Sequence, residues 1–171
     1  MGKAYLSLGS NIDAERKLRS AFAALRERFG ALVASNVYRF PAVGLDGPDF
    51  LNAAAVIDSD LDPFALNDWL HALEDAHGRD RSGPRFGDRP LDIDIVFYDD
   101  LVMSGPGHLQ LPRDELRHAF VLRPLAEIAP AFRDPRTGRS LAELWSASPE
   151  REVACALAFD PAVPPGHAGE G

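Results

Sequence analysis

Two aspartates stand one residue apart in the apolar segment LDIDIVFY, which begins at Leu91. The segment has the length and composition of a β-strand, and strand side chains alternate between the two faces of a sheet. Asp92 and Asp94 therefore project to one face, while Leu91, Ile93 and Ile95 project to the other. Two adjacent carboxylates repel each other, and a divalent cation such as Mg²⁺ relieves that repulsion. The spacing predicts a metal site, and the alternative is a solvated strand face that pairs with arginines.

Four arginines come shortly before this segment, in a chain with 18 basic residues: Arg79, Arg81, Arg85 and Arg89. Glycines are interspersed among them, which predicts a loop. Guanidinium groups form paired hydrogen bonds with phosphate oxygens. We therefore interpret the loop as a lid that closes over a metal-bound polyphosphate. The alternative is a surface segment that balances the many acidic side chains of the protein.

A third group of residues suits a flat ligand. Phe50 and Asn52 share one face of a predicted strand, so an aromatic ring lies beside an amide that both donates and accepts hydrogen bonds. An edge aromatic beside an asparagine that caps a loop is equally compatible with the pattern. Phe120 is either a second aromatic ring that stacks on the ligand or part of the core, and its residue type alone favours the core. Glu74 either orients an arginine or is solvated, which is more usual at a helix end.

Several common site types are absent from the sequence. It has no Walker motif, no GxGxxG motif and no nucleophile elbow, so any phosphate chemistry must use the arginines and aspartates. The single cysteine, Cys155, can form no internal disulfide, which suits a reducing compartment. The histidines show no metal-ligand spacing, and each is expected to be structural or exposed: His71, His77, His108, His118 and His167.

The whole chain has the composition of an ordinary globular protein. Of its 171 residues, 46% are hydrophobic and 26% are charged. The formal net charge of −8 opposes nucleic-acid binding, which depends on clustered positive charge. No run of about 18 apolar residues is long enough to span a bilayer, and the first residues do not resemble a signal peptide. We expect a cytoplasmic monomer that binds neither nucleic acid nor membranes.

Apolar periodicity and turn signals predict the element order βαββαβ. The predicted strands cover residues 3–8, 31–40, 50–57 and 91–98, and the two predicted helices end at Gly30 and Gly78. This order predicts a ferredoxin-like α/β (α+β) fold, a three-layer sandwich around an antiparallel sheet. Both helices would cover one face and leave the other for a site or an extra layer.

The remainder of the chain is less regular. A short helical turn, an apolar run at residues 120–125 and a small helix at residues 141–145 are predicted. We expect one domain over residues 1–159. Residues 160–171 are rich in proline and glycine, and this composition predicts a disordered tail.

Four motifs together give the sequence a resemblance to a known family. They are LGSN at residues 8–11, PDFLNAAAVI at 48–57, HGRDRSGPRFGDRPLDIDI at 77–95 and FVLRPLAEIAP at 120–130. From Ala4 to Pro130 the chain resembles the 6-hydroxymethyl-7,8-dihydropterin pyrophosphokinase family of folate biosynthesis. The series G-R-x-R, R-[WF]-G-x-R and D-[IL]-D-[IL] is its most specific part. The resemblance implies an enzyme that transfers the terminal pyrophosphate of ATP to the hydroxymethyl group of the dihydropterin and releases AMP.

The resemblance also implies roles for residues around ATP. By that similarity, Asp92 and Asp94 hold two Mg²⁺ ions between the ATP phosphates and the substrate hydroxyl that attacks the β-phosphorus. Arg79 and Arg89 are the implied principal arginines of phosphate binding and transfer. The other implied residues of the nucleotide site are Glu74, Arg81, Arg85, Phe86, which stands where the family usually has Trp, Ile95 and Arg113.

For the pterin, the resemblance implies an aromatic sandwich. Phe50 and Phe120 would enclose the ring from its two faces, and Asn52 would form hydrogen bonds with its edge. The backbone of the loop that contains Val43 would close over the ring. The implied substrate-binding residues of that loop are Pro41, Val43 and Gly44.

The chain departs from the family pattern at three places. Arg113 replaces the histidine of the usual L-P-H-P sequence, which contacts the nucleotide, and the segment from there to Phe120 is one residue shorter. Residues 40–42 read Phe-Pro-Ala instead of a Thr-Pro-Pro type sequence. Arg113 can still contact a phosphate, which favours continued use of ATP. Two alternatives stay open: a paralogue that acts on another pterin-like alcohol, and an inactive module that binds a nucleotide or a pterin.

Overall fold

The sheet is built around its first strand, β1 (Gly2–Ser10), whose partners come from much later in the sequence. The structure is a computed structural model that describes residues 1–41, 49–78 and 90–164. The other strands of the main sheet are β2 (Val33–Ala34), β3 (Val37–Phe40), β4 (Phe50–Ser59), β5 (Asp92–Tyr98) and β8 (Ala156–Phe159). They follow the order β5-β1-β4-β3-β8, with β2 also paired to β4, and each of these pairings is antiparallel.

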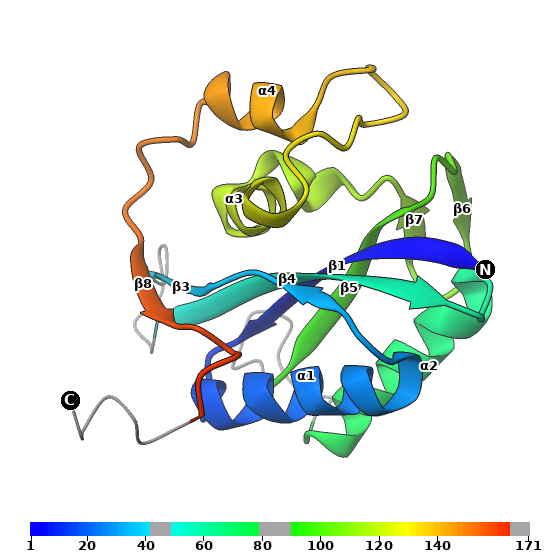
Figure 1. The fold of residues 1–171 in the computed structure, drawn as a ribbon, viewed down its shortest axis with the longest axis vertical. Coiled ribbons are helices and arrows are strands. Elements are labelled where there is room, and N and C mark those ends of the chain that lie inside the picture. The colour runs from blue at the N-terminus through cyan, green and yellow to red at the C-terminus, as the bar shows by residue number, and fades with distance from the viewer. Residues whose placement is uncertain (42–48, 79–89, 165–171) are drawn as a thin grey trace.

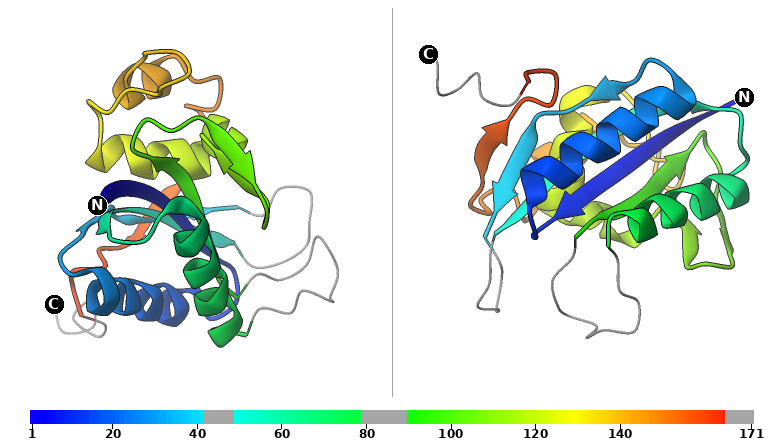
Figure 2. Two further views of the ribbon diagram at one scale, coloured as in Figure 1. Left: turned by 90° about the vertical axis from the view of Figure 1, so that its right-hand side faces the viewer. Right: turned by 90° about the horizontal axis from the view of Figure 1, so that it is seen from below.

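Helices lie on both faces of this sheet (Figures 1 and 2). One face carries α1 (Ala14–Phe29) and α2 (Pro63–Ala76), and the other carries α3 (Ala119–Ile128). α4 (Leu141–Ser146) packs against α3 on the side away from the sheet. A hairpin of β6 (Met103–Gly105) and β7 (Leu109–Leu111) and a 3₁₀ turn, η1 (Asp114–Arg117), connect β5 to α3. The predicted βαββαβ order and the three-layer antiparallel sandwich are confirmed, and α3 and α4 supply the extra layer.

Strand alternation divides the apolar side chains between two cores. Leu6 and Leu8 of β1 pack with α1 and α2, whereas Tyr5 faces the second core beneath α3 and α4. Ile93 and Ile95 of β5 lie in the first core with less than 3% exposure. Full burial of such a side chain contributes about 1.5–3 kcal/mol. The predicted division of β5 into an apolar face and an acidic face is therefore confirmed.

The helix signals at α2 also act as predicted. Asp62 caps the helix, because its Oδ1 accepts a hydrogen bond from the backbone N–H of Ala65 at 2.8 Å. Pro63 occupies the first helical position, where no N–H partner is needed. This cap fixes where α2 begins, and thus which of its side chains reach the edge of β5.

One predicted strand is interrupted. Residues 31–40 form the two short strands β2 and β3 instead of one, and the break lies at Ser35. The backbone N–H of Ser35 donates to Ala54 O at 2.9 Å, while Ser35 Oγ accepts from Ala54 N at 2.8 Å. The pairing with β4 shifts by one residue across this point. A side-chain hydroxyl thus replaces one backbone partner, which strand periodicity alone does not indicate.

A β-bulge interrupts the acidic strand. The pairing of β1 with β5 passes from Tyr5 opposite Phe97 to Leu6 opposite Ile95, so Val96 is an extra residue on β5. Val96 and Phe97 both lie in the core beneath α3. The Val96 carbonyl accepts a hydrogen bond from the backbone N–H of Arg113 at 3.0 Å. The bulge therefore ties the segment after β7 to the strand that carries the two aspartates.

The C-terminal part adds a strand that the sequence did not predict. β8 extends the sheet beyond β3, although its side chains are largely exposed and show no clear alternation. Of the predicted disordered tail, residues 160–164 are described, and Val163 O accepts a hydrogen bond from Arg19 Nη1 at 2.5 Å. Residues 165–171 lie outside the described residues.

Hydrogen bonds to one carboxylate connect α3 to β3. Tyr38 Oη donates to Glu127 Oε1 at 2.5 Å, and Asn36 N donates to Glu127 Oε2 at 3.0 Å. Burial, and then the hydrogen bond to Glu127, raise the pKa of Tyr38 to about 12. These contacts fix the position of α3 over the sheet.

Within the described ranges, none of the helices combines the length and the apolar character needed to cross a membrane.

Candidate active site

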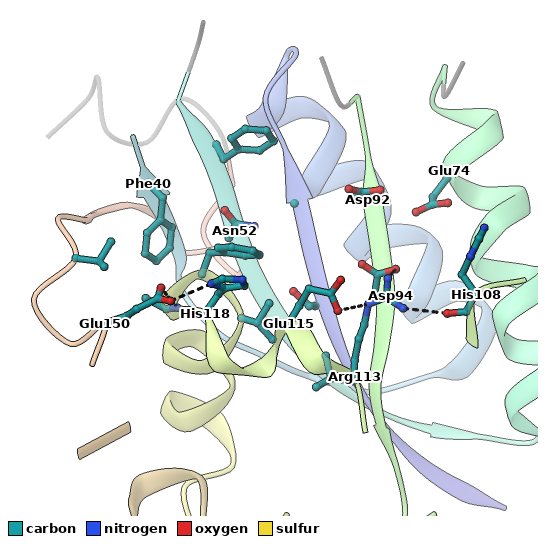
Figure 3. Close-up of a pocket in the computed structure, with 18 of the residues that line it drawn as sticks. Phe40, Asn52, Glu74, Asp92, Asp94, His108, Arg113, Glu115, His118 and Glu150 are labelled. Atoms are coloured by element: carbon teal, nitrogen blue, oxygen red, sulfur yellow. Dashed lines mark hydrogen bonds and ion pairs between the residues drawn. The ribbon is translucent and has the colours of Figure 1, made fainter. Parts of the chain in front are cut away.

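A cavity of about 820 Å³ opens on the α3 side of the sheet (Figure 3). Its floor is formed by the end of β1 and the beginnings of β4 and β5, whose side chains on this face point away from α1. Among the described residues, the walls are formed by α2, the β6–β7 turn, the start of α3 and the segment around Glu150. In Figure 3, Glu74, Asp92 and Asp94 lie toward one end of the cavity, and Phe40 and His118 lie toward the other.

The acidic end contains the predicted aspartate pair. Asp92 and Asp94 both line the cavity, and each is partly exposed. Arg113 Nη2 lies 3.5 Å from Asp94 Oδ1, and its Nε lies 3.1 Å from Glu115 Oε2. Arg113 Nη1 also donates to the carbonyl oxygen of His108 at 3.3 Å. A guanidinium group is thus held between the carboxylates of Asp94 and Glu115 at the acidic end of the cavity.

Glu74 also belongs to this end, and it is not solvated. Only 3% of the residue is exposed, and its Oε2 accepts a hydrogen bond from the backbone N–H of Ile93 at 2.8 Å. The N–H is available because β5 is at the edge of the sheet and one side of it has no neighbouring strand in the main sheet. The expectation that a helix-end carboxylate is solvated was therefore wrong, since α2 lies against β5.

Glu74→Ala is expected to lower the free energy of unfolding by about 1–3 kcal/mol, because the buried Ile93 N–H loses its acceptor. Urea unfolding followed by circular dichroism measures the change. The matched control is Asp68→Ala, at an exposed position of the same helix, for which a change within about 0.5 kcal/mol is expected. Equal stability of Glu74→Ala and wild type would contradict a structural role for this carboxylate.

The other end of the cavity combines aromatic rings with an amide. Phe50, Asn52 and Phe120 line it as the sequence suggested, together with Phe40 and Pro41. Phe120 is 37% exposed. The expectation that this phenylalanine belongs to the core was therefore wrong. Asn52 is only 6% exposed. A flat ligand would therefore meet rings on its faces and an amide at its edge.

One buried polar atom at the aromatic end of this cavity, Asn52 Oδ1, has no hydrogen-bond partner in residues 1–41, 49–78 and 90–164. At the acidic end, Arg113 Nε is buried and forms no hydrogen bond within these ranges, and its partner is the Glu115 carboxylate in the ion pair. An unpaired buried acceptor costs about 1–3 kcal/mol, so Asn52 Oδ1 calls for a donor. It suits a ligand with N–H groups on a flat ring.

Gly9 determines how closely the Asn52 side chain approaches β1. The two residues are directly opposite each other in the β1–β4 register. A Cβ atom at Gly9 would lie 2.7 Å from Asn52 Nδ2, closer than real Cβ contacts allow. The glycine of the LGSN motif has no side chain, and this leaves room for the Asn52 amide.

Several cavity residues were missed by the sequence analysis, and two of them are in contact with each other at the aromatic end. His118 and Glu150 line the aromatic end, and His118 Nδ1 lies 2.9 Å from Glu150 Oε2. Burial raises the pKa of Glu150, but hydrogen bonds from Ala119 N and His118 outweigh it and hold this pKa below its ordinary value. His118 stands two residues before Phe120, which was a usable signal, whereas nothing in the sequence around Glu150 indicates a site.

The other histidines divide into two groups. His71 and His108 line the acidic half of the cavity. His108 is exposed, as expected, whereas its place at the cavity was not foreseen. His77 is structural as expected, because its Nδ1 is hydrogen-bonded to Leu73 O at 2.8 Å. His167 lies outside the described residues.

Several predicted site residues are not placed at the cavity by the structure. The side chain of Ile95 lies in the first core, so only its backbone remains available to a ligand. The remaining predicted residues lie outside the described ranges: Val43, Gly44, Arg79, Arg81, Arg85, Phe86 and Arg89.

The aspartate pair has the donor atoms that Mg²⁺ prefers. Among the described residues, no group of three or more His, Cys, Asp or Glu side chains is arranged to hold a metal ion. A cation at Asp92 and Asp94 would therefore take its remaining ligands from water and from a bound phosphate. This is the usual surrounding of Mg²⁺ in phosphoryl-transfer sites, so the residues fit the ion.

The sequence matches known proteins over most of its length. Residues 5–130 match the family described as 7,8-dihydro-6-hydroxymethylpterin-pyrophosphokinase (HPPK). A Synechocystis protein named 2-amino-4-hydroxy-6-hydroxymethyldihydropteridine pyrophosphokinase is 34% identical over 176 residues, which cover 95% of this chain and 89% of the relative. A protein of the same name from Methylorubrum extorquens is 43% identical over 135 residues, which cover 76% of this chain and 84% of the relative.

The fold matches solved structures as well. The crystal structure of wild-type Plasmodium falciparum HPPK-DHPS superposes with a TM-score of 0.69 at 14% identity, over 88% of this chain. The chain spans 46% of that longer protein. At this identity the likeness shows a common fold and nothing further.

Proposed function

The chain belongs to the 7,8-dihydro-6-hydroxymethylpterin-pyrophosphokinase family, and from this premise we propose how its cavity performs the reaction of the family. The chain is an ATP-dependent pyrophosphokinase, and the family reaction transfers pyrophosphate from ATP to the hydroxymethyl group of a dihydropterin in folate biosynthesis. The observation that carries the proposal is a single cavity that joins the unpaired buried acceptor Asn52 Oδ1 to the aspartate pair. Its volume of about 820 Å³ is that of a small-molecule site.

The aromatic end is the pterin subsite in this proposal. A pterin is flat and carries N–H and amino donors on one edge, which match the acceptor Asn52 Oδ1. Phe50 and Phe120 contact the two faces of the ring, as aromatic side chains do with heterocycles. Pro41 lines the same end. The proposed contributions of Val43 and Gly44 rest on the family resemblance alone.

The acidic end is the phosphate subsite. Asp92 and Asp94 would hold two Mg²⁺ ions, and bound Mg²⁺ would neutralise phosphate charge and orient the reacting oxygens. Arg113 Nη2 lies 3.5 Å from Asp94 Oδ1, so this guanidinium group would contact a phosphate oxygen bound beside that aspartate. The arginines of the 79–89 segment, above all Arg79 and Arg89, add positive charge by family resemblance, and Glu74 and the backbone of Ile95 lie beside the nucleotide.

The two subsites define the reaction geometry. The hydroxymethyl oxygen of the pterin attacks the β-phosphorus of ATP, a new P–O bond forms, and the bond to the oxygen that bridges the α- and β-phosphorus breaks. The proton of the hydroxyl group passes to water during this attack, and AMP departs with the bridging oxygen. The contribution of the chain is to position the two substrates and to stabilise the negative charge of the transfer.

An assay of AMP release from ATP tests this function. The purified chain is mixed with ATP, Mg²⁺ and a panel of pterin alcohols that includes 6-hydroxymethyl-7,8-dihydropterin. We expect AMP and the pterin diphosphate to form with that alcohol and only when Mg²⁺ is present. Activity confined to another alcohol would identify a paralogue. This alternative is motivated by Arg113, which stands in place of the usual histidine. Binding of a non-hydrolysable ATP analogue without turnover would instead identify an inactive binding module.

Gly9→Ala is expected to raise the KM for the pterin about threefold to tenfold. The new Cβ atom moves the Asn52 amide away from the ring edge, and a neutral hydrogen bond contributes about 0.5–1.5 kcal/mol. The KM for ATP, measured in the same steady-state assay, should not change. In an Asn52→Ala background, Gly9→Ala should have almost no further effect. An equal loss in both backgrounds would show that Gly9 acts independently of Asn52.

A further inference from the structure

A carboxylate from the C-terminal part of the chain caps the helix that presents Phe120. His118, the N-cap residue of α3, makes no side-chain capping bond of its own. Instead, Glu150 Oε1 accepts a hydrogen bond from the backbone N–H of Ala119 at 3.0 Å. A negative charge at this position also interacts favourably with the helix dipole. Glu150 thus fixes the backbone directly before Phe120.

The same carboxylate forms a hydrogen bond with His118, whose ring stacks on that of Phe120. Glu150 Oε2 accepts from His118 Nδ1 at 2.9 Å, as Figure 3 shows. The rings of His118 and Phe120 are stacked, with centroids 5.2 Å apart and an interplanar angle of 11°. Phe120 is 37% exposed, so core packing does not hold it on all sides. Both oxygens of one carboxylate therefore support the exposed aromatic ring, one through the backbone and one through His118.

We propose that Glu150 is a positioning residue that holds Phe120, through His118 and Ala119 N, in the orientation that stacks on the pterin. This inference rests on the proposed function of the cavity. Glu150 and Val153 line the cavity although they follow the residues that match the family, 5–130. The segment that contains them therefore completes the pterin subsite, beyond the part of the chain that carries the family motifs.

Steady-state kinetics of Glu150→Ala test the proposal. We expect the KM for the pterin to rise about tenfold, which is the loss of a charge-assisted hydrogen bond, with the KM for ATP and kcat unchanged. Glu150→Gln keeps an acceptor for Ala119 N and should recover most of the pterin affinity. The matched control is Glu152→Ala, an exposed glutamate of the same segment, which should behave as wild type. The midpoint of thermal unfolding of Glu150→Ala should fall by only about 2–4 °C.

A double-mutant cycle with Phe120→Ala separates positioning from general destabilisation. If Glu150 acts through Phe120, Glu150→Ala has almost no further effect on pterin affinity once Phe120 is removed. Additive effects, or an equal rise of the KM for ATP and for the pterin, would overturn the proposal. So would wild-type pterin affinity in Glu150→Ala. These outcomes require a wild-type protein that turns over the dihydropterin, and failure of that turnover would refute the proposed function instead.

Discussion

Asp94→Ala is expected to reduce the rate of AMP release by about a thousandfold or more. In the proposed function the carboxylate supplies a ligand for the cations that balance the phosphates, a contribution of several kcal/mol. Each 1.36 kcal/mol corresponds to about a factor of ten in rate. The side chain projects into the cavity and is 35% exposed, so its removal leaves both cores intact. Coupled detection of AMP measures the rate, and circular dichroism checks the fold.

The control for this variant is Asp100→Ala. Asp100 is an exposed residue just after the same strand and is not part of the cavity lining. It should retain wild-type turnover. A second readout is calorimetric titration of Mg²⁺ with a non-hydrolysable ATP analogue, in which Asp94→Ala should lose most of the metal-dependent binding. Turnover near wild type in Asp94→Ala would disprove its assignment as a metal ligand.

Arg113→Ala is expected to lower kcat/KM for ATP about thirtyfold to several thousandfold. The Arg113 side chain is 20% exposed, and its guanidinium group lies between Asp94 and Glu115. Loss of one member of such a buried, hydrogen-bonded charge pair with a ligand costs about 2–5 kcal/mol. The KM for the pterin should change little, because Arg113 lies at the acidic end of the cavity. Steady-state kinetics with each substrate varied in turn measure the difference.

The same variant should have the opposite effect on divalent cations in the absence of nucleotide. Arg113 places a positive charge 3.5 Å from Asp94, which repels a second cation there. Titration of the free protein with Mn²⁺ should therefore show tighter binding in Arg113→Ala. Arg117→Ala, at an exposed position of η1, is the control for general charge effects. Arg113→His restores the usual family residue and should retain more activity than Arg113→Ala. An unchanged KM for ATP in Arg113→Ala would contradict the assignment of Arg113 to the phosphate subsite.

Side-chain direction within a strand could be predicted from the sequence. Alternation alone placed Asp92 and Asp94 on one face and the apolar residues of β5 on the other, and it placed Phe50 beside Asn52. The element order up to residue 98 followed from periodicity and from cap signals such as Asp62-Pro63. These features depend on a few consecutive residues, and for that reason short-range patterns specify them.

Features that depend on distant backbone atoms could not be predicted. Glu74 accepts a hydrogen bond from the backbone N–H of Ile93, which pairs with no strand in the described part of the chain. Arg113 reaches Asp94 because its backbone N–H donates to the carbonyl of Val96 at the bulge. Glu150 meets His118 across 32 residues of sequence. Each contact requires the register of the sheet or the packing of α3, and neither is encoded in the local pattern. β8 was missed for the same reason, since it is defined by its pairing with β3.

The central position of β1 has a consequence for when the enzyme becomes functional during its synthesis. Ser7 pairs with Ala54 on one side and with Asp94 on the other, and the cavity is closed by Glu150. β1 must therefore wait for partners that are synthesised later. Such non-local pairing is slow to form, and a chain shorter than about 150 residues lacks one wall of the site. Pterin binding in the proposed subsite is therefore expected to begin only after residue 153 has been added to the chain.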